Sequence, residues 1–120
     1  MTTEDGKPKI FDLIERTSKF GEDSIIFSTK MKITTITRPI ISQFIRSATS
    51  VGANYMEADC AESKKDFMHK IGIAKKESKE TMYWLHMISI ALPEHKKECW
   101  QLRKEAEELT LIFSAITKNK

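Results

Sequence analysis

The sequence predicts an all-α protein, an antiparallel four-helix bundle with up-down-up-down topology. Apolar residues recur at roughly the 3.6-residue helical period in four segments, and no strand pattern has a partner elsewhere in the chain. The segments correspond to helices of about 30–40 Å with short connections, which favours antiparallel neighbours. With 120 residues, of which 40% are hydrophobic and 31% charged, the chain has the composition of one globular domain.

The first helix is expected over about residues 9–29, after a polar lead-in at residues 1–8 that contains Gly6 and Pro8. Gly21 weakens the middle of this helix. The β-branched run that ends near residue 37 would suit a strand, but it has no partner strand. The positions expected to face the core are Ile10, Leu13 or Ile14, Thr17, Phe20, Ile25 and Ser28.

The second helix is expected over residues 38–59, after a turn at 34–37 in which Thr37 can act as the N-cap. Gly52 costs about 1 kcal/mol relative to alanine inside a helix, but beside Ala48 it lets another helix approach closely. The expected core positions are Ile41, Phe44 or Ile45, Ala48, Val51 or Gly52, and Tyr55.

Ser63 and Asp66 form a capping-box-like start for a third helix over residues 64–91. Its expected core positions are Phe67, Ile71, Ala74, Ser78, Thr81 or Met82, Leu85 and Ile88. Pro93 ends that pattern and opens a fourth helix over 94–117, followed by a frayed end at 118–120. The fourth helix presents Cys99, Leu102, Ala106, Leu109, Ile112 or Phe113, and Ile116.

The sequence shows no catalytic constellation, so we expect no enzyme, no metal and no cofactor. A carboxylate-bridged metal site in a bundle needs paired Glu-x-x-His motifs that point inward. The only near match is Asp66-x-x-His69, where Asp66 is better explained as the cap partner and His69 lies about 160° from the core stripe. The three histidines share no face, and no glycine-rich phosphate loop is present.

The third helix carries a basic stripe opposite its core positions. Residues 64–86 contain six lysines against three acidic residues, whereas the rest of the chain sums to zero charge. The stripe consists of Lys65, His69, Lys76, Lys79 and Tyr83. Lysines interleaved with an aromatic residue are typical of a surface that binds nucleic-acid phosphates. A solvated lysine face, which every soluble helix has, is the simpler interpretation, and both stay open.

Two further sets of residues flank the core stripes. Ile73, Trp84 and Met87 lie between the core and the basic stripe, where they either form a self-association surface or widen the bundle core. A polar stripe on the second helix consists of Arg46, Ser50, Asn54 and Glu57. Once buried, such groups need partners, for example Arg46 or lysines of the third helix. A structural network is the favoured interpretation of this stripe, and a ligand site is the alternative.

The compartment is expected to be the cytoplasm. The polar N-terminus is not a signal peptide, and no apolar run approaches the roughly 20 residues that span a bilayer. Cys60 and Cys99 are expected near opposite ends of the bundle, too far apart for a disulfide, and so to be free thiols.

Three segments of the chain are specific enough to compare with a known family, RSATSVGANYMEA at 46–58, SKKDFMHKI at 63–71 and KKESKETMYWL at 75–85, with a weaker match in FDLIERTSKF at 11–20. In these segments the chain resembles the four-helix-bundle proteins of the 23S rRNA intervening-sequence family. The resemblance covers about residues 9–117. It implies a ring-like homopentamer and no catalytic residue. A related branch, the accessory protein of diversity-generating retroelements, implies binding of a reverse transcriptase and nucleic acid through a basic surface.

The sequence therefore predicts a non-enzymatic homo-oligomeric bundle that binds RNA or a ribonucleoprotein partner through the basic stripe. The alternative is an assembly or adaptor bundle without a nucleic-acid role. In that alternative Ile73, Trp84 and Met87 carry the interface, and the lysines only maintain solubility.

Overall fold

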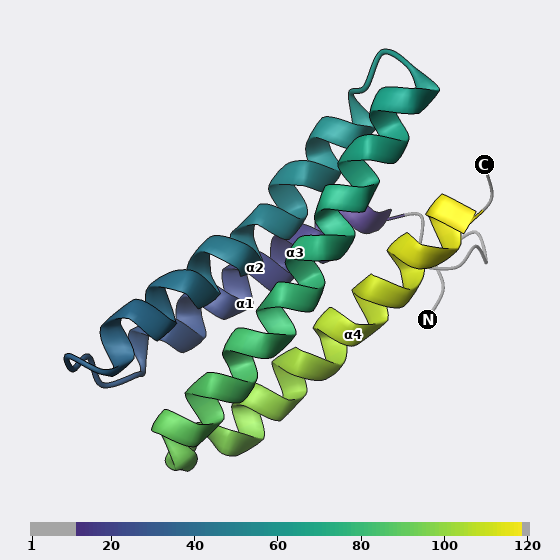
Figure 1. The fold of residues 1–120 in the computed structure, drawn as a ribbon. Helices are drawn as coiled ribbons and strands as arrows, with labels where there is room; N and C mark the ends of the chain where they lie inside the picture. Colours follow the sequence, from purple (N-terminus) through teal and green to yellow (C-terminus); the bar gives the residue numbers. More distant parts are fainter. Residues whose placement is uncertain (1–11, 119–120) are drawn as a thin grey trace.

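The computed structural model describes residues 12–118, which form a bundle of four α-helices (Figure 1). Consecutive helices run in opposite directions, so the predicted four-helix bundle is confirmed. No strand occurs in the described part of the chain. The elements are α1 (Leu13–Thr29), α2 (Thr37–Asp59), α3 (Lys64–Ala91), the short 3₁₀-helix η2 (Pro93–His95) and α4 (Lys96–Lys118).

The ends of the expected elements differ slightly from those observed. The lead-in at 1–8, the expected start of the first helix at 9–11, and residues 119–120 lie outside the described residues. Helix α2 begins one residue earlier than expected. The fourth helix was expected from residue 94, but Pro93–His95 form a single 3₁₀ turn before α4, a common arrangement at the start of an α-helix.

The sequence suggested Thr37 as the N-cap of α2, but Thr37 is the first residue of this helix and Ile36 holds the N-cap position. The hydroxyl of Thr34, in the turn before the helix, takes over the bonding to the backbone there. The Thr34 hydroxyl accepts hydrogen bonds from the backbone N–H groups of Ile36 (3.2 Å) and Thr37 (3.1 Å). The Thr37 hydroxyl in turn accepts one from the Thr34 N–H (2.8 Å) and donates one to the Lys32 carbonyl (2.7 Å). The hydroxyl of each threonine thus accepts a hydrogen bond from the backbone N–H of the other, as happens between the first and fourth residues of a capping box. The Ser63 cap of α3 is confirmed, since its hydroxyl accepts from the Asp66 N–H at 3.0 Å.

Residues from all four helices form one apolar core. Its buried members are Leu13, Phe20, Phe27, Met31, Ile41, Phe44, Ala48, Val51, Ala58, Ile71, Ala74, Leu85, Ile88, Leu92, Cys99, Ala106, Leu109 and Phe113. Most of the expected core positions on α2, α3 and α4 are confirmed. On α1 the expectation for Ile25 is wrong, because Ile25 is 47% exposed while Phe27 is 4% exposed. The Phe27 ring packs edge-on against Phe44, with centroids 6.2 Å apart, and takes the inward position.

The core also contains several buried hydroxyl groups. Most bond to a carbonyl of their own helix, as Thr17 does to Leu13 (2.7 Å) and Ser24 to Phe20 (2.8 Å). The hydroxyls of Ser47 and Thr81 lie 2.9 Å apart and join α2 to α3. Among the described residues, no buried side-chain nitrogen or oxygen lacks a hydrogen-bond partner. These side chains are short and satisfied locally, so helices can approach closely without the cost of an unpaired polar group.

Both cysteines are free thiols, as expected. Cys60 is exposed directly after α2, whereas Cys99 is buried in the first turns of α4. Burial, helped by the neighbouring carboxylate of Glu98, raises the pKa of the Cys99 thiol to about 11. Because the thiolate is the reactive form, Cys99 is protected while the bundle is folded.

Helices α1 and α2 approach each other closely at Gly52. A Cβ atom at this position would lie 3.3 Å from the Thr17 carbonyl oxygen and 3.4 Å from its hydroxyl oxygen. A Cβ atom at Gly72, in the third turn of α3, would meet nothing within 4 Å. The helix that the sequence led us to expect close to Gly52 is therefore α1.

The same alanine substitution should thus act differently at the two glycines. We expect Gly72→Ala to raise the free energy of unfolding by about 0.5–1 kcal/mol, because alanine is the better helix former. Gly52→Ala should fall short of that gain by about 1 kcal/mol or more, because the new methyl group presses on backbone atoms that cannot rotate away. Urea denaturation of the two variants measures the difference. Equal gains would show that α1 shifts freely.

Candidate nucleic-acid interface

The five residues of the predicted basic stripe lie along the outer side of α3 and are all exposed; we call them the basic face. They are Lys65, His69, Lys76, Lys79 and Tyr83. Among residues 12–118, no carboxylate lies within ion-pair distance of the three lysine ammonium groups. Their charge is therefore available to a partner.

Lys70 shows the contrast within the same helix. Its ammonium group lies 2.7 Å from the Glu57 carboxylate of α2, and this hydrogen bond raises the pKa of Lys70. Lys70 thus helps to join two helices, while the lysines of the basic face are exposed and make no such pair within residues 12–118.

The first turn of α3 is unusual for its charge. Lys64 and Lys65 stand beside the partially positive N-terminus of the helix, where cations are unfavourable. Asp66 and the Ser63 cap offset this in part. Stability of the helix alone does not explain cations at this position, which is consistent with a role in binding.

The predicted interface residues Ile73, Trp84 and Met87 are each half-buried, and Trp84 packs against the edge of the core. Beyond them, Tyr83 is 54% exposed and Ile90 is 67% exposed. Ile90 follows Tyr83 by seven residues, or two helical turns, so both lie on the outer side of α3. The sequence analysis missed Ile90, although its seven-residue spacing from Tyr83 could have identified it as an outer residue of α3.

The polar stripe of α2 does not form one network. Arg46 reaches α3, where its guanidinium lies 3.2 Å from Glu77 and 2.6 Å from Glu80. The Asn54 amide donates instead to the Ser50 carbonyl in its own helix (2.9 Å), and Glu57 pairs with Lys70. Short polar side chains on a helix can bond to the preceding turn, which removes the need for a shared partner.

Arg46 therefore joins α2 to α3. Its hydrogen bond lowers the pKa of Glu80 below the ordinary value of 4.5, and the Trp84 indole N–H, which donates to the same carboxylate at 3.2 Å, adds to the effect. Glu77 is buried, so Arg46 also compensates a carboxylate that has little access to water.

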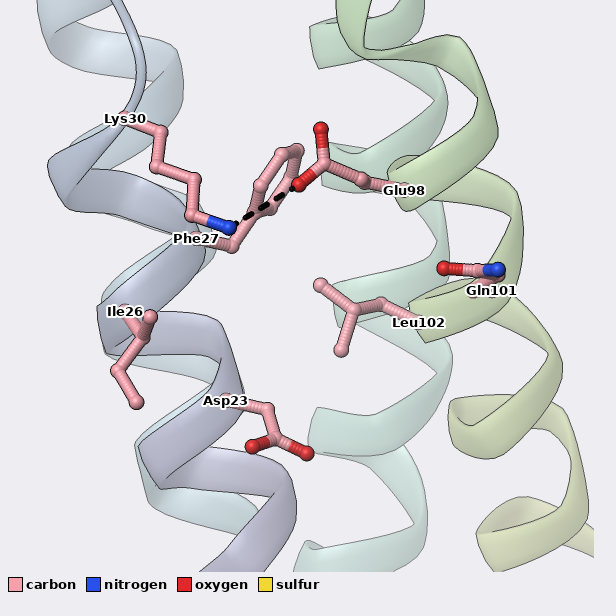
Figure 2. Close-up of a pocket in the computed structure, with 7 residues that line it drawn as sticks. All are labelled: Asp23, Ile26, Phe27, Lys30, Glu98, Gln101 and Leu102. Carbon is pink, nitrogen blue, oxygen red and sulfur yellow. Dashed lines mark ion pairs between the residues drawn. The ribbon is translucent and has the colours of Figure 1, made fainter.

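A hollow of about 230 Å³ between α1 and α4 was not anticipated from the sequence (Figure 2). Figure 2 shows Phe27, Ile26 and Lys30 on one side and Leu102 and Glu98 on the other. Lys30 and Glu98 pair across it at 3.5 Å. The hollow is smaller than typical ligand pockets of about 300–1,000 Å³. No pattern within one helix marks such a feature, because two helices far apart in sequence form it.

Within residues 12–118, no group of three or more His, Cys, Asp and Glu side chains is arranged to hold a metal ion. In the same residues, no helix combines the length and the apolar character that crossing a membrane requires.

The ion pairs of Arg46 predict a pH-dependent contribution to stability. At neutral pH, we expect Arg46→Gln to lower the free energy of unfolding by about 1–2 kcal/mol, between the values for exposed and buried pairs. Because the pKa of Glu80 is depressed, the stabilisation is present above pH 4.5 and is lost as pH falls below that value. Urea denaturation at several pH values should give a smaller acid-induced loss in the variant than in the parent.

The control for this prediction is Lys19→Gln, which removes an exposed ion pair within α1. This variant should have a much smaller effect at neutral pH and should keep the acid dependence of the parent. An Arg46→Gln variant with unchanged acid dependence would contradict the assignment of Glu80.

Comparisons with known proteins agree with the fold. The chain is similar to a crystal structure of a protein of unknown function from the S23 ribosomal protein family of Bacteroides thetaiotaomicron VPI-5482, with a TM-score of 0.79 and 25% identity. The alignment covers 93% of this chain and all of the other. None of the curated proteins matches the sequence significantly. The model of the 23S rRNA-intervening sequence protein family matches residues 12–115, and the chain belongs to that family.

Proposed function

We propose that this protein is a non-enzymatic, homo-oligomeric bundle that binds RNA through the basic face of α3. The observation that carries the proposal is the row of Lys65, Lys76 and Lys79, which are exposed and have no ion-pair partner among residues 12–118. From Lys65 to Tyr83 the row extends about 27 Å along the helix axis. A rigid row of cations of that length matches a stretch of phosphate backbone better than a compact ligand.

Self-association supports this role by repeating the row. One copy offers a modest charge, but several copies in one assembly give a multivalent surface whose avidity exceeds that of a single site. We propose that the copies meet through the apolar flank of α3, which comprises Ile73, Trp84 and Met87, together with the exposed Ile90 near the end of the helix. Apolar side chains that reach the surface next to one another are typical of an interface between proteins.

Replacing the three lysines by glutamine should weaken RNA binding. We expect Lys65→Gln, Lys76→Gln and Lys79→Gln together to affect all RNA sequences about equally, since phosphate contacts carry no sequence information. They should also reduce the slope of log affinity against log salt concentration. Each phosphate neutralised on a single strand contributes roughly 0.7 to that slope, so the loss of three lysines should reduce it by about 2 for each chain that contacts the RNA. Fluorescence anisotropy with labelled RNA over a range of salt concentrations measures both effects.

The matched control replaces Lys32, Lys96 and Lys97 by glutamine, which removes the same charge from exposed positions outside the basic face. This variant should keep most of the affinity. Equal losses in the two triple variants would mean that net charge, and not the basic face, attracts RNA. Absence of binding in low salt would reject the proposal.

A second candidate function is an assembly or adaptor bundle without a nucleic-acid role, which the exposed apolar residues of α3 favour. Ile90→Glu should then break the oligomer and abolish function, because it places a charge in the interface without disturbing the core. The lysine substitutions would leave assembly and partner binding intact. Light scattering coupled to size-exclusion chromatography, with absorbance at 260 and 280 nm, separates the two functions.

A further inference from the structure

The aromatic end of the basic face is held in place by contacts that reach into the bundle. The Tyr83 ring lies 4.9 Å from the Trp84 ring at an interplanar angle of 77°, and Tyr83 remains 54% exposed. Trp84 itself is half-buried against the core. Tyr83 is therefore packed on one side and open to solvent on another.

A row of polar contacts fixes Trp84. Its indole N–H donates to Glu80 at 3.2 Å, Glu80 accepts a 2.6 Å hydrogen bond from Arg46, and Arg46 also pairs with the buried Glu77. The ring that supports Tyr83 is thus anchored to α2 as well as to α3. An aromatic side chain supported in this way loses little conformational freedom when a ligand stacks on it.

The cations nearest to Tyr83 stand in line with it. Lys79 precedes it by one helical turn and Lys76 by two, about 6 and 11 Å along the axis. Both are exposed and have no ion-pair partner among residues 12–118. An aromatic face next to a row of cations is the arrangement by which proteins bind single strands, with bases stacked on the ring and phosphates on the cations.

We propose that the basic face selects unpaired RNA, with one base stacked on Tyr83 and the neighbouring phosphates held by Lys79 and Lys76. This rests on the proposed RNA-binding function and names the class of RNA. In a duplex the base faces are covered by their neighbours, so Tyr83 has nothing to stack on. A single-stranded segment, loop or end exposes the base.

The test compares a labelled oligouridine of about a dozen nucleotides, within the usual site size of single-strand binders, with a blunt RNA duplex of equal length. The parent should bind the single strand more tightly. Tyr83→Ala should weaken single-strand binding roughly ten- to a hundredfold, the usual range for one stacked base, and leave duplex binding unchanged. Tyr83→Phe, which keeps the ring, should retain the affinity of the parent.

Trp100→Ala is the matched control, since Trp100 is another exposed aromatic residue, in α4, with Lys104 over its ring at 4.7 Å. It should bind both RNAs as the parent does. Trp100→Phe leaves Trp84 as the sole tryptophan in the chain, and its emission should change when the oligouridine binds beside it.

The outcomes separate this inference from the function on which it rests. If Tyr83→Ala binds the single strand as tightly as the parent, stacking on Tyr83 is wrong while RNA binding by the lysines stands. If the parent prefers the duplex, the selection of unpaired RNA is wrong. If the parent binds neither RNA in low salt, the proposed function itself fails.

Discussion

The bundle depends on how closely α2 approaches its two neighbours. On one side Gly52 leaves room for the Thr17 backbone of α1, and on the other the Ser47 and Thr81 hydroxyls meet between α2 and α3. Larger side chains at these points would separate the helices and expose the core. Because the small polar residues are satisfied locally, the close contacts carry no penalty for unpaired groups. The register between α2 and α3 follows from this fit.

The register between α2 and α3 also decides which polar residues meet at the surface of the bundle. It places Arg46 opposite Glu77 and Glu80, which follow each other by three residues and so share one side of α3. Through Glu80 the same contact orients Trp84, and through Trp84 it supports Tyr83. The geometry of an exposed aromatic residue thus depends on a guanidinium of another helix. The support reaches Tyr83 alone, since the lysines of the basic face are exposed and make no such contacts in the described part of the chain.

The sequence was informative where one helix decides the outcome. The helical period identified the inward positions of α2, α3 and α4, and the Ser63 cap depends on residues within four positions of each other. The sequence was less informative where consecutive apolar residues compete for one core position. Ile25, Ile26 and Phe27 are consecutive, and the Phe27 ring is the one that turns inward, where it packs against Phe44 and His95.

The partners of polar residues were equally hard to predict. The period indicated that Arg46, Ser50, Asn54 and Glu57 share a stripe. It did not show that Asn54 bonds within its own helix while Glu57 pairs across to α3. The hollow between α1 and α4 depends likewise on two helices at opposite ends of the chain.

The contact between α1 and α4 also has a consequence for motion. Side-chain bridges such as Arg16 to Glu105 (2.8 Å) and Lys30 to Glu98 carry much of the contact between α1 and α4. We therefore expect transient opening to begin between α1 and α4, with backbone amides of α1 exchanging with solvent before those of α3.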